Sequence, residues 1–439
     1  MAEIRPFRGL YYNQRLVKDL SAVICPPYDI ITPQMQQELY QRSEYNFVRV
    51  EHNRELPQDT AEDNKYSRSA ATLEQWLKSG ILKVDIVPSI YLHDHYFTYH
   101  GKEYKRRGIT VRVRLEEWEK GVIRPHEGTL DKPKSDRLSL LWALQANTSP
   151  ILALYEDPGQ RVTSLLTAGK PDKPLLSLKG AGGENHYVWA ITEPGVIEQI
   201  CGSLASQPLY IADGHHRYES ALTYQRERYA CSSSAPADET FNFVMMTIVD
   251  LADPGLLILP PHRLIRGISK SALSELKSEL ATFFDMAELS LDEPDVWDKL
   301  DELLAHEDNQ VKLAVFGLSD RRIFVLTLRD WTATSRMMPY FHTDIYKKLD
   351  VSVVDHIILE RILGISSGHA ETSLAYSYDR KDAVSRVLDQ EYQLTFILSP
   401  IKADVIKSIA DAGDRMPRKS TYFYPKLPSG LILNRLVQS

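Results

Sequence analysis

An apolar strand that meets a glycine and turns at once into a helix constrains this chain more than any other segment. It spans residues 208–222 and reads Pro-Leu-Tyr-Ile-Ala-Asp-Gly-His-His-Arg-Tyr-Glu-Ser-Ala-Leu. Its first half predicts a buried strand, and the apolar residues after Gly214 recur at the spacing of one helical face. So tight a junction aims the free backbone N–H groups of the first helical turn beyond the end of the strand. The segment therefore predicts an anion site.

The polar side chains of this turn favour phosphate as the anion. An arginine offers a bidentate fork to phosphate oxygens, and histidines can donate further hydrogen bonds. The residues expected to hold phosphate are Gly214, His215, His216 and Arg217. Asp213 and His216 are the catalytic candidates, with Asp213 also a candidate metal ligand. Two other interpretations stay open, namely a helix N-cap by Asp213 beside solvated histidines, and zinc binding by Asp213 with one histidine.

A second charged string, residues 124–137, reads Arg-Pro-His-Glu-Gly-Thr-Leu-Asp-Lys-Pro-Lys-Ser-Asp-Arg. Its prolines and glycine predict a loop, which is where proteins commonly display catalytic groups. Glu127 is the candidate base that takes a hydroxyl proton. The candidates for further phosphate contacts are Lys132, Lys134 and Arg137. The alternative is a solvated run of charges with no chemical role.

Three shorter features supply candidate substrate contacts. The candidates are Asp29 in Pro-Pro-Tyr-Asp, His126 beside the candidate base, and Asn147 and Ser149 in Asn-Thr-Ser-Pro. The prolines before Asp29 form a rigid shelf, although a structural turn explains them equally well. The Asn-Thr-Ser-Pro string also fits an ordinary strand-end turn. Residues 419–426 place aromatic residues between lysines, and we interpret them as terminal packing; the alternative is nucleotide stacking with phosphate contacts from the basic residues.

The chain alternates helix-like and strand-like stretches along its 439 residues, which is too long for one ordinary core. We expect a mixed α/β (α+β) multi-layer fold with three domains. Their expected bounds are residues 1–120 for an N-terminal mixed domain, 121–267 for the phosphate-binding catalytic region, and 268–439 for a C-terminal α/β domain with a closing tail.

The charge balance argues against polyanionic partners. The net charge is -7, so the overall field attracts neither nucleic acid nor an anionic membrane. The three cysteines are far apart, so we expect reduced thiols. Because the first residues resemble no secretory signal and no stretch is apolar enough to span a bilayer, we expect a cytoplasmic protein. The oligomeric state stays open, with a homodimer among the alternatives.

Taken together, the separated strings resemble the domain of unknown function 1015 family over almost the whole length. The strings that carry this resemblance are Pro-Pro-Tyr-Asp, residues 124–137, Asn-Thr-Ser-Pro, the turn at 213–218 and the tail at 419–428. The middle region also resembles the ParB/sulfiredoxin superfamily, especially the free-serine kinases of archaea, which pair a Pro-His-Glu string with a later Asp-Gly-His-His-Arg turn. The resemblance implies a ParB/sulfiredoxin-like central domain, with Glu127 as base and the turn as phosphate cradle.

The turn of this chain differs from those of sulfiredoxins and ParB proteins, and each difference argues against the function of that relative. Sulfiredoxins carry a cysteine where His215 stands, so peroxiredoxin repair is not expected. ParB proteins carry Gly-Glu-Arg-Arg where this chain has Gly-His-His-Arg, and no helix-turn-helix string follows.

We therefore expect a serine kinase that uses Mg²⁺ and either pyrophosphate or a nucleotide as donor. One alternative is a ParB-like nucleotide-binding switch that phosphorylates no metabolite. A metal-dependent hydrolase built on His126 with His215 or His216 is a third interpretation.

Overall fold

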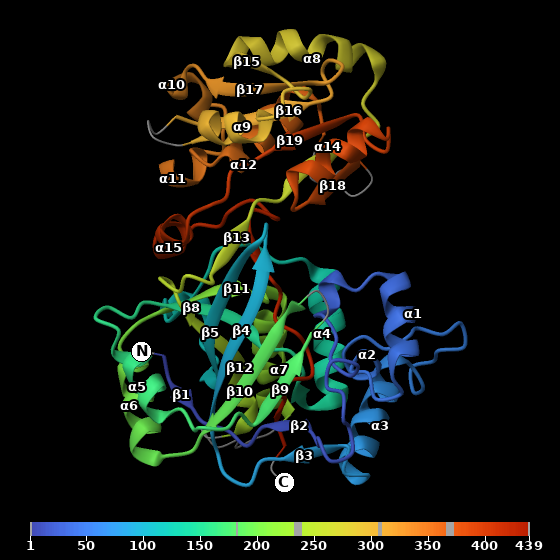
Figure 1. Ribbon diagram of the computed structural model, residues 1–439, viewed down its shortest axis with the longest axis vertical. Helices are drawn as coiled ribbons and strands as arrows, with labels where there is room; N and C mark the ends of the chain where they lie inside the picture. The colour runs from blue at the N-terminus through green and yellow to red at the C-terminus, as the bar shows by residue number, and fades with distance from the viewer. Residues whose placement is uncertain (1, 181–182, 232–238, 306–309, 366–372, 438–439) are drawn as a thin grey trace. The chain divides into compact units, whose positions relative to one another are not determined.

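The computed structural model describes residues 2–180, 183–231, 239–305, 310–365 and 373–437. These residues form two compact units, one comprising 1–125, 129–257 and 425–439, the other 126–128 and 258–424. Both units mix helices and sheets, which confirms the expected mixed α/β class (Figure 1).

A nine-stranded sheet organises the first unit in its described residues. In spatial order the strands are β6 (Ile123–Pro125), β11 (Leu209–Asp213), β8 (Ile151–Tyr155), β12 (Phe243–Asp250), β5 (Lys102–Arg114), β4 (Ile90–Tyr99), β10 (Asn185–Ile191) and β9 (Leu176–Lys179), with β1 (Ile4–Arg5) paired to β5. Two short pairs accompany it, β2 (Leu10–Tyr12) with β3 (Leu82–Val84), and β7 (Ala146–Asn147) with β21 (Asn434–Arg435). β11 runs parallel to β6 and antiparallel to β8.

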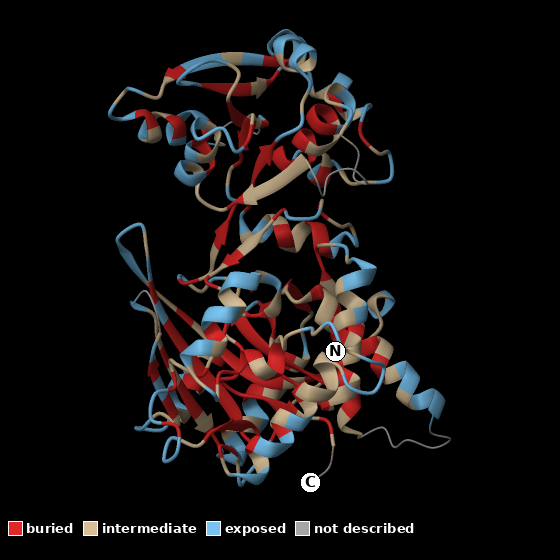
Figure 2. Cartoon of the chain, turned by 90° about the vertical axis from the view of Figure 1, so that its right-hand side faces the viewer, coloured by how far each residue is buried: buried red, intermediate tan, exposed pale blue. Residues whose placement is uncertain are grey.

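Helices cover both faces of this sheet. They are α1 (Pro33–Arg42), α2 (Val48–Glu51), α3 (Lys65–Lys78), α4 (Asp131–Leu144), α5 (Arg161–Gly169), α6 (Pro194–Ala205) and α7 (His215–Cys231), with 3-10 turns at η1 (Tyr28–Ile30), η2 (Trp118–Lys120) and η4 (Thr240–Asn242). One core joins the sheet to α5, α6 and α7, and the other joins its opposite face to α3 and α4. Consecutive strand residues enter opposite cores because side chains alternate along a strand, and the strands are accordingly buried in Figure 2.

The second unit contains an antiparallel six-stranded sheet in its described residues. Its strand order is β15 (Phe284–Ser290), β17 (Arg322–Leu328), β16 (Lys312–Phe316), β19 (Leu394–Ile397), β14 (His262–Ile265) and β18 (Leu374–Ser377), and β13 (Leu257–Leu259) pairs separately with β20 (Tyr422–Tyr424). The helices are α8 (Lys270–Phe283), α9 (Val296–Leu304), α10 (Trp331–Ser335), α11 (Asp344–Lys347), α12 (Asp350–Val353), the π-helix η5 (Val354–Ile362), α14 (Arg380–Leu388) and α15 (Ala403–Asp411). Apolar side chains of α9 and α14 pack on this sheet.

The unit boundaries differ from those expected from the sequence. Residue 120 falls inside the first unit because β5, before it, pairs with β12, after it. The closing segment, residues 425–439, also belongs to the first unit rather than to the C-terminal domain. Its Leu431, Ile432 and Leu433 are buried in the core that contains α3 and α4, and this burial holds it there.

Part of the 124–137 string is helical rather than a loop. Helix α4 begins at Asp131, so Pro133 is its third residue. Proline is tolerated in the first helical turn because the N–H that it lacks has no partner there. The expected loop is therefore limited to residues 126–130, between β6 and α4.

Candidate functional site

The strand-glycine-helix turn forms as the sequence predicts. β11 ends at Asp213, Gly214 follows with φ +96°, and α7 begins at His215. A Cβ atom at position 214 would lie 3.0 Å from the Arg217 guanidinium carbon, in a conformation that side chains rarely adopt. Glycine is therefore required twice, for the backbone conformation and for space.

Asp213 is the centre of charge at this turn. Its Oδ2 accepts a hydrogen bond from Arg217 Nη2 at 2.6 Å, and its Oδ1 pairs with the Lys426 ammonium. Burial alone would raise the pKa of Asp213, but the two cations outweigh burial and hold that pKa well below its ordinary value. The carboxylate is consequently anionic at any pH near neutrality.

Arg217 and Lys426 hold positive charge at the N-terminal end of α7. Arg217 also donates to the Pro150 carbonyl, while its buried Nε has no hydrogen-bond partner among the described residues. Lys426 lies 3.8 Å from Asp29 Oδ2, which places the exposed Asp29 at the edge of this group. Two cations thus share one buried carboxylate beside the N-terminal end of α7.

The two histidines of the turn differ in their environments. His215 is buried, with 7% of its surface exposed, and lies close enough to contribute to the lowered pKa of Asp213. The Nε2 of His216 accepts a hydrogen bond from the Leu130 backbone N–H at 2.9 Å. Since Nε2 is the acceptor, a neutral His216 carries its proton on Nδ1. His216 therefore ties the turn to the segment that precedes α4.

The cations predicted on the second string lie on α4 but differ in accessibility. Arg137 is buried, donates to Asp136 at 2.6 Å and lies over the Tyr28 ring at 3.9 Å. Lys134 pairs with Asp131 at 3.2 Å, whereas Lys132 is exposed. Among these residues, Arg137 is therefore already neutralised and Lys132 points to solvent.

Four predicted residues from three strings do line one cavity. These are Arg137, Asn147, Ser149 and Arg217. The cavity measures about 40 Å³, which suits water rather than a substrate. Asn147 accepts from the Met245 backbone and from Asn434, each at 3.0 Å, and Ser149 bonds to Ser429. The structure brings these four residues together, and each is already hydrogen-bonded to another protein group.

Glu127 and His126 belong to the second unit. Glu127 Oε1 accepts hydrogen bonds from the Ser420 and Thr421 backbone N–H groups at 3.2 and 3.3 Å. His126 is fully buried, with its Nε2 3.0 Å from the Thr421 hydroxyl. The segment 420–421 thus holds the Glu127 carboxylate in place through its Oε1 atom.

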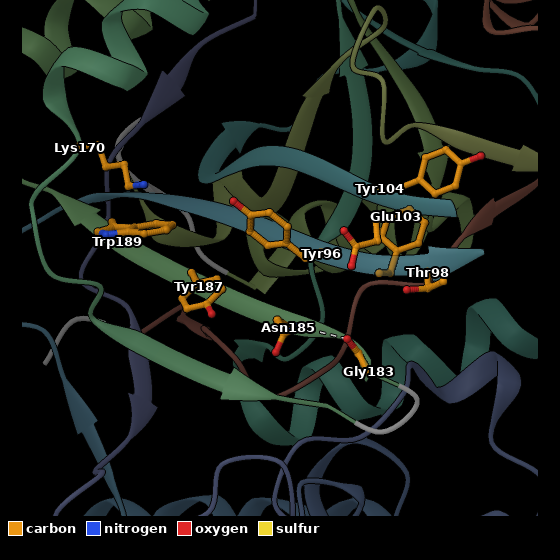
Figure 3. Close-up of a pocket in the computed structure, with 10 residues that line it drawn as sticks. Tyr96, Thr98, Glu103, Tyr104, Lys170, Gly183, Asn185, Tyr187 and Trp189 are labelled. Atoms are coloured by element: carbon orange, nitrogen blue, oxygen red, sulfur yellow. Dashed lines mark hydrogen bonds between the residues drawn. The ribbon is translucent and has the colours of Figure 1, made fainter. Parts of the chain in front are cut away.

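A larger cavity, of about 410 Å³, lies elsewhere on the first unit (Figure 3). Aromatic rings of β4 and β10 line it, including Tyr96, Tyr187 and Trp189, and the Lys170 ammonium lies 3.7 Å from the Trp189 ring centre. None of the site residues predicted from the sequence lines this cavity.

Lys426 is the site residue that the sequence did not single out. It stood in the tail string interpreted as aromatic packing, and 213 positions separate it from Asp213. The lysines at the two ends of this string were the available signal for a cation at the site. Only the packing of the closing segment brings it to the turn.

Comparisons with known proteins give one family and several remote structural similarities. The solved structures include a free serine kinase in complex with AMP (13% identity, TM-score 0.36, covering 74% of this chain and 92% of that one). They also include a conserved hypothetical protein from Pyrococcus furiosus (13%, 0.35, 74% and 95%) and SbnI with a C-terminal truncation from Staphylococcus aureus (11%, 0.36, 75% and 90%). TM-scores of this size carry no argument about function.

No curated protein matches the chain. Among the described residues, no helix is both long and apolar enough to cross a membrane. A family model described as "Protein of unknown function (DUF1015)" matches residues 4–352, which is most of the sequence. The chain therefore belongs to the DUF1015 family.

Proposed function

We propose that this chain is a phosphotransferase that moves a phosphoryl group from pyrophosphate or a nucleotide to the hydroxyl of free L-serine. The observation that carries the proposal is the turn at Gly214, where Arg217 and Lys426 gather around Asp213 at the positive end of α7. The separated strings that resemble free-serine kinases add the expectation of serine as acceptor.

Phosphoryl transfer demands positioning and charge neutralisation more than covalent chemistry. In the proposal, the amide N–H groups after Gly214 and the Arg217 guanidinium hold the transferring phosphoryl oxygens. The Lys426 ammonium leaves Asp213 for a donor phosphate when the donor binds. His215 and His216 complete the cradle.

Glu127 is the proposed base. Its Oε1 is held by the Ser420 and Thr421 backbone N–H groups, and we propose that Oε2 faces the serine hydroxyl. The carboxylate orients that hydroxyl and accepts its proton late in the transfer. Asp29, His126, Asn147 and Ser149 remain proposed as substrate contacts.

Mg²⁺ fits this site as a partner of the donor phosphates. Before the donor binds, both oxygens of Asp213 pair with cations, so a metal ion could reach Asp213 only after Lys426 has moved to a donor phosphate. Mg²⁺ commonly binds through substrate phosphates and retained waters rather than through a protein cage. The proposed Mg²⁺ therefore arrives with the donor.

The test supplies purified protein with L-serine, Mg²⁺ and one donor at a time, namely pyrophosphate, ADP or ATP. O-phosphoserine, measured by mass spectrometry, should form with at least one donor. Absence of product with every donor would contradict the proposal. Tight nucleotide binding without product would favour the alternative of a nucleotide-binding switch.

A further inference from the structure

Three imidazoles and one carboxylate meet on the face of β4 and β10 opposite the aromatic cavity. His186 lies directly across from His95 in the register of the two strands, and His93 shares their face because it is two residues from His95. Glu184 immediately precedes β10. The three histidines are buried, with at most 5% of their surfaces exposed, and the Glu184 side chain is 31% exposed.

The polar atoms of this cluster converge on one point. His95 Nε2 lies 3.0 Å, and His186 Nε2 3.5 Å, from the same Glu184 oxygen, Oε2. The three candidate ligand atoms all lie within 4.8 Å of one another. Two ligands that each lie about 2.1 Å from a tetrahedral zinc ion are about 3.4 Å apart. The observed spacings therefore already approximate those around a bound ion.

A hydrogen-bond network is the simpler explanation, but it accounts less well for this convergence. A carboxylate that serves two buried imidazoles has two oxygens with separate lone pairs available. Here both imidazoles approach the same oxygen, and their rings stack with centroids 4.0 Å apart. One oxygen has two lone pairs and can serve both imidazoles, but the arrangement also gathers three ligand atoms around a single point, as a shared cation would.

His93 gives His186 the support that histidine ligands usually have, whereas the contact between His95 and Arg106 would have to change on metal binding. His93 Nε2 lies 3.1 Å from His186 Nδ1, so His93 can accept a hydrogen bond from the Nδ1–H of His186 and leave His186 Nε2 free for a metal ion. Arg106 Nη2 lies 3.3 Å from His95 Nδ1 and donates at 2.7 Å to the Pro425 carbonyl. Metal binding at His95 Nε2 would place a proton on Nδ1, which would loosen the longer of these two contacts.

We propose that His95, Glu184 and His186 bind a divalent transition metal ion of the zinc class, with His93 orienting His186. Two imidazoles and a carboxylate are a zinc donor set that leaves one coordination position open. The partly exposed Glu184 is the side from which the ion enters. This proposal stands independently of the proposed kinase activity.

The test uses the full-length protein freed of metal by a chelator and then titrated with Zn²⁺ in a calorimeter. We expect one equivalent of zinc to bind and to remain after gel filtration. Glu184→Gln and His186→Gln should each weaken binding at least tenfold, and His93→Gln should weaken it about 10- to 100-fold. His100→Gln and Glu103→Gln, on exposed residues of the same hairpin, are the matched controls.

Cobalt provides a second measurement that separates ligand loss from misfolding. Co²⁺ bound to the wild-type protein should give the visible absorption of a four-coordinate site, and Glu184→Gln should abolish it while circular dichroism is unchanged. Glu184 suits this comparison because it is partly exposed and glutamine preserves its shape. A wild-type protein that retains no zinc, or a Glu184→Gln protein that binds zinc as the wild type does, overturns the proposal.

Discussion

The charge of the turn around Asp213 depends on two cations, Lys426 and Arg217. Both cations contact the same carboxylate, so these three side chains carry one net positive charge before any substrate binds, and the Asp29 carboxylate lies 3.8 Å from Lys426 at their edge. A donor phosphate can replace the carboxylate as partner of either cation, and charge-assisted bonds to phosphate are strong.

A Lys426→Met variant should show what the ammonium group of Lys426 contributes to catalysis, apart from the packing of its side chain. We expect Lys426→Met to lower kcat/KM for serine phosphorylation by a factor on the order of 100, because one preorganised cation is lost. Lys179→Met, at an exposed residue of the same unit, is the control and should behave as wild type. Steady-state kinetics with thermal unfolding would check both, and equal kcat/KM in the two variants would remove Lys426 from the mechanism.

The candidate base permits a conservative change. In Glu127→Gln, the amide oxygen can still accept the Ser420 and Thr421 hydrogen bonds, so the local structure should persist while basicity is lost. We expect kcat to fall by about 10²- to 10⁴-fold with KM nearly unchanged. Single-turnover measurements of O-phosphoserine would test this, and normal turnover would exclude Glu127 as base.

Asp213 should make the protein sensitive to acid. Its pKa is lowered in the folded state, so its contribution to stability is full above the unfolded-state pKa of roughly 4 and is lost as the pH falls through the lower folded value. Chemical denaturation at a series of pH values should therefore show stability falling below about pH 4. Asp213→Asn should flatten that part of the profile, and an unchanged slope would contradict the assignment.

At the scale of elements, the closing segment performs two separate tasks. It buries Leu431, Ile432 and Leu433 against the sheet, and it carries Lys426 to the turn. Deletion of residues 425–439 should lower the midpoint of thermal unfolding, since burial of each such side chain contributes about 1.5–3 kcal/mol. Lys426→Met should lower that midpoint less than the deletion does, because it removes one cation from Asp213 but leaves the three leucine and isoleucine side chains packed, so differential scanning calorimetry of both variants separates the two tasks.

Local patterns predicted those elements whose signals lie close together in the sequence. Thr32 caps α1 with Pro33 as its first residue, and the β4–β5 hairpin turns at Gly101, so the residues that signal each of these elements lie within it or directly beside it. α4 was missed because Pro133 was interpreted as a helix breaker, although it lies in the first turn. For the site, the strand-glycine-helix turn was predictable from local periodicity, but the Lys426–Asp213 pair depends on packing between distant segments, which no local pattern encodes.

At the scale of the whole molecule, the two units are interleaved along the chain. The second unit comprises residues 258–424 and the short stretch 126–128, both of which interrupt the first unit. The DUF1015 family model covers residues 4–352 and therefore extends beyond the first unit into the second. The family is consequently defined by parts of both units.

Excision of most of the second unit should test what each unit contributes. A protein in which a glycine-serine linker replaces residues 258–424 retains both cores of the first unit and should unfold cooperatively. It should form no O-phosphoserine, because Glu127 loses the Ser420 and Thr421 groups that hold it. Urea unfolding and product analysis would check this, and undiminished kinase activity would show that the second unit is dispensable.

The position of the closing segment in the sequence also imposes an order on folding during synthesis. A ribosome makes residues 425–439 only after residues 258–424, so Leu431, Ile432 and Leu433 are missing from the core with α3 and α4 while the second unit is made. Long-range closures of this kind slow folding and leave apolar surface open to association. The nascent protein should therefore depend on chaperones until that segment arrives.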